Sequence, residues 1–178
     1  PYPERFIEVL RECGALRALL PEVDALFGVP QPPRHHPEID TGLHVLLCLR
    51  EAARQNASLP VRYAVLLHDL GKALTPAQEL PAHHGHEARG ATLAEAVSKR
   101  LRAPVACREL AVLVARHHLT VHRARELKPS TMVDLLEALD AFRRPERLRE
   151  ILAACEIDAR GRTGLEDRPY PSSEHVLW

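Results

Sequence analysis

The feature that most constrains the fold of this chain is the spacing of its apolar residues, which recur at steps of three and four along nearly the whole sequence. No stretch alternates between apolar and polar residues in the way that a half-buried strand requires. Aromatic residues make up only 4% of the 178 residues, whereas aliphatic residues and alanine dominate, and this composition favours helices. The sequence therefore predicts an all-α protein.

Proline and glycine divide the chain into parts. A first helical lobe at about 3–27, interrupted at Gly14, is followed by a loop at 28–33, because three prolines within 30–33 cannot lie inside a helix. Asp40 or Thr41 is expected to cap the next helix, and Gly71 to end the following one as a left-handed cap. The helices expected beyond the loop are 41–56, 60–71, 85–101, 104–118, 129–142 and 145–160. We expect a neck or linker segment at 1–33, a main domain at 34–165 and a mostly irregular tail at 166–178.

The overall composition excludes some classes of protein. The 24 basic and 24 acidic residues balance, so net charge alone would not bind nucleic acid, although local basic clusters can still guide a polyanion. The four cysteines are scattered without a CxxC pair and are expected to be reduced. No apolar stretch reaches the roughly 20 residues needed to span a bilayer. A cytoplasmic location without membrane contact is expected, and the absence of an initiator Met suggests a piece of a longer protein.

Polar residues interrupt the apolar helical faces at five places. The pair His68-Asp69 ends the apolar run 64–67, and Asp158 continues the apolar stripe of the last long helix. Buried groups of this kind cost free energy unless a partner satisfies them. The residues placed at core-facing positions or helix ends are His44, His68, Asp69, His86, His117, His118 and Asp158.

Each of these residues has an ordinary structural explanation on its own. A single inward histidine is more often a hydrogen-bonded core residue than a ligand, and Asp158 could cap a helix or pair with an arginine. One divalent cation would satisfy the whole set, and imidazole with carboxylate suits Ni, Mn, Mg, Zn or Fe. The lack of thiolate ligands argues against a structural zinc site. The histidines expected to be mostly solvated, or to lie behind the ligands, are His35, His36, His83, His84 and His122.

The order H, HD, H, H, D on a helical chain resembles the HD-domain superfamily of metal-dependent phosphohydrolases. Longer strings extend the resemblance over about 3–171 to the C-terminal half of bacterial multifunctional CCA-adding tRNA nucleotidyltransferases. These strings are RFIEVLRECGAL, LPEVDALFGVP, HPEIDTGLHVL, RYAVLLHDLGKALTP, HHGHEARG and CEIDARGRTGLEDRPYP. The resemblance implies an HD-domain helical bundle preceded by a short helical lobe.

The resemblance also implies roles for individual residues. It assigns the metal to His44, His68, Asp69 and Asp158. It places His86 and His118 at a second metal or the substrate phosphate and leaves the role of His117 open; the mechanism that we expect uses Asp69, His86, His118 and Lys72 in catalysis. Lys72 is the first candidate to neutralise a phosphate, and Arg89, Arg123 and Arg160 are weaker ones.

The function implied is a phosphohydrolase with 2',3'-cyclic phosphodiesterase, 2'-nucleotidase and phosphatase activities on RNA 3' ends or nucleotides. In that family an N-terminal head adds C, C and A to tRNA. This chain has neither a Gly-Gly followed by Arg-Asp nor an Asp-x-Asp pair, so it is not expected to add nucleotides, and the head would be its partner in a parent chain. The alternatives are a tRNA-binding or dimerisation module with a structural or vestigial metal site, and a nucleotide-specific hydrolase of the 5'-nucleotidase type. Homodimer formation is left open.

Overall fold

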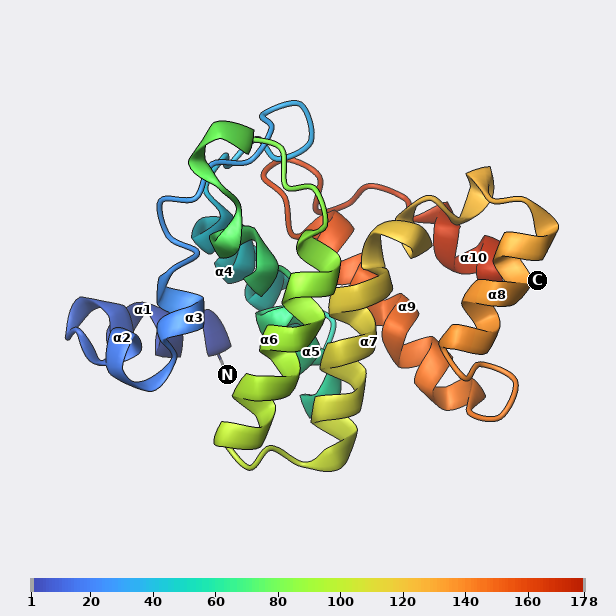
Figure 1. Ribbon diagram of the computed structural model, residues 1–178, viewed down its shortest axis with the longest axis horizontal. Helices are drawn as coiled ribbons and strands as arrows, with labels where there is room; N and C mark the ends of the chain where they lie inside the picture. The colour runs from blue at the N-terminus through green and yellow to red at the C-terminus, as the bar shows by residue number, and fades with distance from the viewer. Residues whose placement is uncertain (1, 178) are drawn as a thin grey trace.

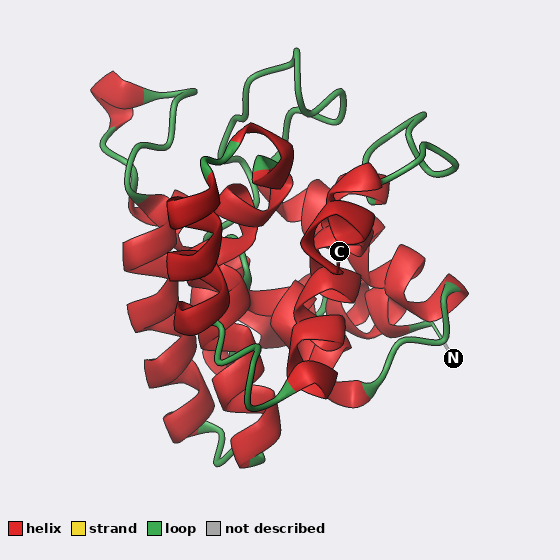
Figure 2. Ribbon diagram, turned by 90° about the vertical axis from the view of Figure 1, so that its right-hand side faces the viewer, coloured by secondary structure: helices red, strands yellow, loops and turns green. Residues whose placement is uncertain are grey.

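The computed structural model describes residues 2–177, and over that range it is built of helices and loops with no strand (Figures 1 and 2). An isolated antiparallel bridge joins Pro30 to Asp40. The prediction of an all-α protein is confirmed. The α-helices are α1 (Pro3–Glu12), α2 (Ala15–Leu19), α3 (Pro21–Asp24), α4 (Thr41–Arg54), α5 (Leu59–Leu67), α6 (His86–Arg100), α7 (Val105–His122), α8 (Pro129–Ala138), α9 (Pro145–Arg160) and α10 (Pro171–Leu177). The short 3-10 helices of the described range are η1 (Leu70–Leu74), η2 (Ala77–Glu79) and η3 (Ala124–Glu126).

The helices form a central bundle with a small lobe on either side. In Figure 1, α1–α3 lie at the left, α8 and α10 at the right, and α4–α7 between them, with α9 behind α7. Helix α7 packs against α5, α6 and α9, and η1 packs against α6. Buried Leu16 of α2, Leu67 of α5 and Ile151 of α9 belong to the same core cluster, so the first lobe shares its core with the bundle.

The helix starts follow the local sequence. The carboxylate of Asp40 accepts a hydrogen bond from the backbone N–H of Leu43 at 2.9 Å, as expected for the cap of α4. Proline occupies one of the first two positions of α5, α8 and α9, where its missing N–H costs nothing. The structure extends α7 to His122, four residues beyond the predicted end, and this extension becomes important at the site.

The prediction that Gly71 is a left-handed cap is wrong. Gly71 lies inside η1, packed against the start of α6, and a Cβ atom there would lie 2.0 Å from the carbonyl oxygen of His86. The missing side chain of Gly71 allows the backbones of η1 and α6 to approach each other closely. On the opposite side, Gly90 of α6 lies against the backbone of Gly71 and His68, so the two elements approach closely there as well.

The prediction of a mostly irregular tail is also wrong. Helix α10 occupies Pro171–Leu177, and its Val176 is buried. Little in the sequence indicates this helix, because it is short and depends on packing against α7 and α9. Among the described residues no disulfide forms: Cys48, Cys107 and Cys155 are buried thiols and Cys13 is exposed. No helix of residues 2–177 is long and apolar enough to cross a membrane.

Candidate metal centre

Four helices and the α5–η1 junction bring a buried polar cluster together. His44 comes from α4, His68 and Asp69 from the end of α5, His86 from the start of α6, His118 from α7 and Asp158 from α9. Each of the six is at most 4% exposed. Their ligand atoms form two groups in which all atoms lie within 4.8 Å of one another, namely His44, His68 and Asp158, and Asp69, His86 and His118.

Three of the histidines are fixed in one tautomer by their own backbone. The Nδ1–H of His68 donates to the carbonyl of Val65 at 2.7 Å. In the same way, Nδ1 of His86 lies 2.6 Å from the carbonyl of His83, and Nδ1 of His118 lies 3.0 Å from that of Val114. A carbonyl oxygen only accepts, so each Nδ1 carries the proton and each neutral ring presents the lone pair of Nε2 to the cluster.

The two carboxylates face these Nε2 atoms. Oδ1 of Asp158 lies 2.9 Å from Nε2 of His44 and 3.7 Å from Nε2 of His68. Oδ2 of Asp69 lies 3.3 Å from Nε2 of His68. Oδ1 of Asp69 lies 3.6 Å from Nε2 of His86 and 3.7 Å from Nε2 of His118. Apart from the hydrogen bond between His44 and Asp158, lone pairs of imidazole nitrogen and carboxylate oxygen converge, which is unfavourable unless positive charge lies among them.

The residues fit a divalent cation. Nε2 of His68, Nε2 of His86 and Oδ1 of Asp69 are buried and have no hydrogen-bond partner within the described residues. Leaving such atoms unsatisfied costs roughly 1–3 kcal/mol each. A cation among them would satisfy all of them at once, and a donor set of imidazole and carboxylate matches the transition metals and magnesium.

The local charges act on the pKa values in two directions. Burial opposes charge at His68, but Asp69 and Asp158 outweigh it and raise the pKa of His68 to about 10. Burial would raise the pKa of Asp69, yet His68 and Lys72 hold it well below its usual value. Burial lowers the pKa of His118 to about 3. The carboxylates are therefore ionised near neutral pH and His118 is neutral, as metal binding requires, whereas His68 must release its proton when a cation binds.

Two further residues lie against the site: Glu38, which the sequence did not indicate, and His122, for which a solvated position and one behind the ligands were both left open. Oε1 of Glu38 is 3.0 Å from Nδ1 of His44, which also lies 3.1 Å from the carbonyl of Gly161. Nε2 of His122 is 2.6 Å from Oδ2 of Asp158. His122 could have been found, because it follows His118 by four residues and so shares its helical face. Glu38 lies in a loop, where no periodicity identifies it.

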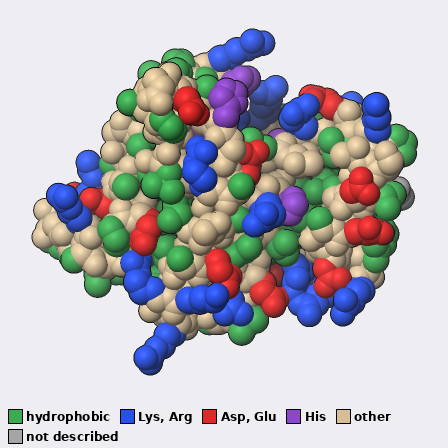
Figure 3. Space-filling model, viewed as in Figure 1, with side chains coloured by type: hydrophobic (Ala, Val, Ile, Leu, Met, Phe, Trp, Pro, Cys, Tyr) green, Lys and Arg blue, Asp and Glu red, His purple; other side chains and the backbone are tan. Residues whose placement is uncertain are grey.

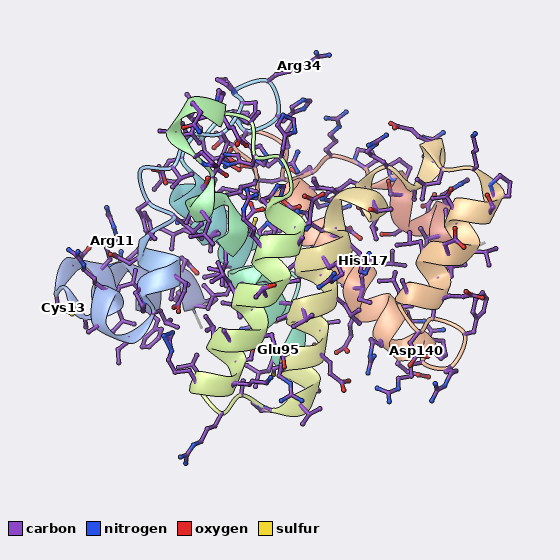
Figure 4. All side chains as sticks on the ribbon, viewed as in Figure 1. Arg11, Cys13, Arg34, Glu95, His117 and Asp140 are labelled. Carbon is purple, nitrogen blue, oxygen red and sulfur yellow. The ribbon has the colours of Figure 1, made fainter. Side chains whose placement is uncertain are left out.

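Other predicted residues have different outcomes. His117 is half-buried on α7 and is not among the clustered ligand atoms, so the expectation that it faces the core site is wrong (Figure 4). The side chain of Lys72 is buried and donates to Asp69 at 2.7 Å and Gln31 at 2.5 Å. Arg89 donates to the carbonyl of His84 at 2.9 Å and does not line the cleft described next.

A cleft of about 1110 Å³ opens beside the cluster. His86, Lys72 and His122 line its inner part. Among the described residues that line it, six are basic and two are acidic, although the chain as a whole is neutral. Basic and histidine side chains gather along the upper part of the face seen in Figure 3. The charged residues of the lining are Lys72, Arg123, Arg125, Arg160, Arg162, Arg168, Glu87 and Glu126.

The fold and the site together define an all-α protein with a buried histidine–aspartate centre suited to a divalent cation, open to a basic cleft. Comparison with known families agrees, since the model of the HD domain matches residues 41–159. The chain belongs to the HD-domain family, which is part of a superfamily of metal-dependent phosphohydrolases.

The relatives of the chain carry the description "Multifunctional CCA protein". The protein of Thioalkalivibrio sulfidiphilus (strain HL-EbGR7) is 59% identical over 174 residues, which are 98% of this chain and 42% of that protein. The protein of Alkalilimnicola ehrlichii is 61% identical over 174 residues, 98% of this chain and 42% of its own length. The protein of Pseudomonas aeruginosa is 56% identical over 177 residues, 99% of this chain and 43% of its own length. The chain thus spans less than half the length of these curated relatives.

Proposed function

We propose that this chain is a metal-dependent phosphohydrolase that acts on 2',3'-cyclic and 2'-phosphates at RNA 3' ends or on nucleotides. The observation that carries the proposal is the set of buried, unpaired Nε2 and carboxylate atoms next to a basic cleft. His44, His68, Asp69 and Asp158 would hold the cation, which is Ni, Mn, Mg, Zn or Fe. When bound, such a cation lowers the pKa of a water molecule and polarises a phosphoryl oxygen.

The other residues of the site then have roles that follow from their positions. Oδ1 of Asp69 is able to accept a hydrogen bond from an attacking water and so orient it. His86 lines the cleft, and its Nε2 points toward Asp69, where it can hold a proton for the leaving oxygen. His118 is more deeply buried and would orient the phosphoryl group. Lys72 fixes Asp69 through its ammonium group and adds positive charge for a phosphate.

The charge of the cleft supports an RNA end as the substrate. Arg125 and Arg168 line the cleft and have no ion pair among the described residues, whereas Arg123 and Arg160 are paired with glutamates at 3.1 Å and 2.7 Å. Free guanidinium groups around a cleft attract the phosphodiesters that precede a chain end. We therefore include Arg125 and Arg168 as contacts for RNA.

A direct test compares turnover of 2',3'-cyclic AMP by the wild type and Asp69→Ala across a panel of divalent metals. Asp134→Ala, at an exposed position of α8, is the matched control. We expect Asp69→Ala to lose at least about 100-fold in turnover, because it removes both a ligand and an orienting carboxylate, and the control to keep full activity. Equal turnover in all three proteins, or no turnover with any metal, would refute the proposal.

The substrate class needs a second comparison. An oligoribonucleotide ending in a 2',3'-cyclic phosphate should have a lower KM than the mononucleotide, and the advantage should shrink with added salt. The double variant Arg125→Ala/Arg168→Ala should lose this advantage, whereas Arg143→Ala, an exposed arginine outside the cleft, should keep it. A mononucleotide preference in the wild type would instead favour the nucleotide-specific hydrolase of the 5'-nucleotidase type, which a wider substrate panel would identify.

The basic cleft also supports the competing proposal of a tRNA-binding or dimerisation module with a structural metal site. Filter binding of tRNA that survives Asp69→Ala, in a protein without turnover, would favour it. Because the relatives are more than twice as long as this chain, we also propose that it works beside an N-terminal nucleotidyltransferase head in the cytoplasm.

A further inference from the structure

We infer that His122 and Tyr170 position the carboxylate of Asp158 for the metal, which makes the segment around Tyr170 part of the centre. The inference rests on the metal site of the proposed function and is independent of the substrate. The sequence left open whether His122 is solvated or lies behind the ligands, and it did not indicate Tyr170, which lies in the segment expected to be irregular. The inference is carried by a continuous chain of hydrogen bonds from Tyr170 through His122 to Asp158.

The first link is the contact between His122 and Asp158. Nε2 of His122 lies 2.6 Å from Oδ2 of Asp158. An ionised carboxylate only accepts, so Nε2–H is the donor. Oδ2 is then engaged on the side of α7, and Oδ1 is the oxygen that faces His44 and His68 at 2.9 and 3.7 Å. His122 therefore decides which oxygen of Asp158 is presented to the cluster.

The second link sets the tautomer of His122. Oη of Tyr170 lies 2.7 Å from Nδ1 of His122. With the proton on Nε2, Nδ1 of the neutral ring is an acceptor, so the tyrosine hydroxyl donates. The two rings also meet edge to face, with centroids 5.6 Å apart. This arrangement holds the His122 ring in place and keeps its proton on the side of Asp158.

The C-terminal segment is tied to the ends of α7 and α9 by further contacts. Oγ of Ser172 donates to the backbone carbonyl of His122 at 3.1 Å. Nε of Arg160 donates to the carbonyl of Arg168 at 3.2 Å, and Val176 of α10 is buried. Two hydrogen bonds thus run from Tyr170 and Ser172 to one histidine. The segment is held where its tyrosine can act on Asp158 through His122.

The consequence is a dependence of metal affinity on residues that do not touch the metal. Hydrogen-bonded partners behind metal ligands commonly change metal affinity by about 10–100-fold when they are removed. Without His122, Oδ2 of Asp158 loses its donor, and only the contacts of Oδ1 with His44 and Arg162 still orient the carboxylate. Without the Tyr170 hydroxyl, Nδ1 of His122 loses its donor and the ring is held less firmly against Asp158, so a smaller loss is expected.

The test measures binding of Mn²⁺ to metal-free protein by isothermal titration calorimetry. The variants are His122→Ala, His122→Gln and Tyr170→Phe, and Arg116→Ala, exposed on the same helix, is the matched control. We expect the Kd of His122→Ala to rise about 10–100-fold. The value for Tyr170→Phe should rise less, and that for the control should not change. The glutamine amide can still donate to Oδ2 of Asp158, so His122→Gln should keep most of the wild-type affinity for Mn²⁺. At saturating Mn²⁺, the kcat of His122→Gln should equal that of the wild type.

The outcomes separate this inference from the proposed function. If the wild type binds no divalent metal, both the proposed function and this inference are refuted. If the wild type binds Mn²⁺ and the three site variants bind it equally well, the inference alone is overturned. Should circular dichroism show that His122→Ala does not fold, Tyr170→Phe decides the matter, because it keeps the ring and removes only the hydroxyl that contacts His122.

Discussion

The close approach of η1 and α6 allows a sharp prediction from a single methyl group. In Gly71→Ala the new Cβ would lie 2.0 Å from the carbonyl oxygen of His86 and 2.6 Å from the backbone nitrogen of Gly90. Both neighbours are backbone atoms, which cannot rotate away as a side chain does. The two elements must therefore separate by more than about 1 Å to reach van der Waals distance. Overpacking of this kind costs roughly 1–3 kcal/mol, and the rigid surroundings place Gly71→Ala near about 3 kcal/mol.

The matched control is on the other side of the same interface. In Gly90→Ala the Cβ would meet Gly71 N at 3.4 Å, His68 O at 3.5 Å and Ala115 Cβ at 3.8 Å, which are ordinary van der Waals distances. Replacing glycine by alanine inside a helix is favourable by about 1 kcal/mol. Gly90→Ala should therefore be neutral or slightly more stable than the wild type, although it adds the same methyl group to the same interface.

Urea unfolding followed by circular dichroism at a helix wavelength measures both variants. The displacement in Gly71→Ala also moves His86 away from Asp69, so turnover should fall by about 100-fold even under conditions where the protein is folded. Equal free energies of unfolding for the two variants, or a Gly71→Ala protein as stable as the wild type, would show that the backbones do not meet as described and would refute the reasoning.

Three further predictions concern other parts of the molecule. Burial would raise the pKa of Glu51, but hydrogen bonds from Arg54 and Gln55 lower it, so its stabilising effect is present above the unfolded pKa and is lost as pH falls through the folded value. Glu51→Gln should lower the free energy of unfolding by about 1 kcal/mol at pH 7, a small loss because Arg54 is half-exposed. Urea unfolding at a series of pH values should show that the difference from the wild type vanishes in acid. In Gly161→Ala the new methyl group would meet both the sulfur of Cys48, at 2.5 Å, and the backbone of the same residue, at 2.7 Å, so the variant should unfold at lower urea. Adding Cys48→Ala should not restore its stability, because the clash with the backbone of α4 persists when the sulfur is removed. Mn²⁺ at 100 times its Kd should raise the melting temperature of the metal-free protein by roughly 5–10 °C, and Asp158→Asn should lose most of this shift in calorimetry.

Much of the fold follows from the sequence because its signals are local. Apolar residues at steps of three and four, with prolines near the starts of α5, α8 and α9, were enough to place most helices to within a few residues. The convergence of six polar residues was predicted for the same reason, since a histidine or aspartate that continues an apolar stripe is placed toward the core, although His117 breaks this rule. His44, His68, Asp69, His86, His118 and Asp158 all lie together as expected.

Tertiary structure decided what local periodicity does not encode. Glu38 lies in a loop, and Tyr170 precedes a short helix that depends on its packing against α7 and α9. Gly71 looked like a helix cap, but its missing side chain allows close approach to a helix that begins fifteen residues further along the chain. His117 and His118 are neighbours in sequence, and only the rotation of α7 against α5, α6 and α9 buries one and leaves the other half-exposed. The sequence by itself determined the apolar face of most helices, because periodicity is a property of one helix. Which partner each buried group meets is a property of how helices pack, and that required the assembled structure.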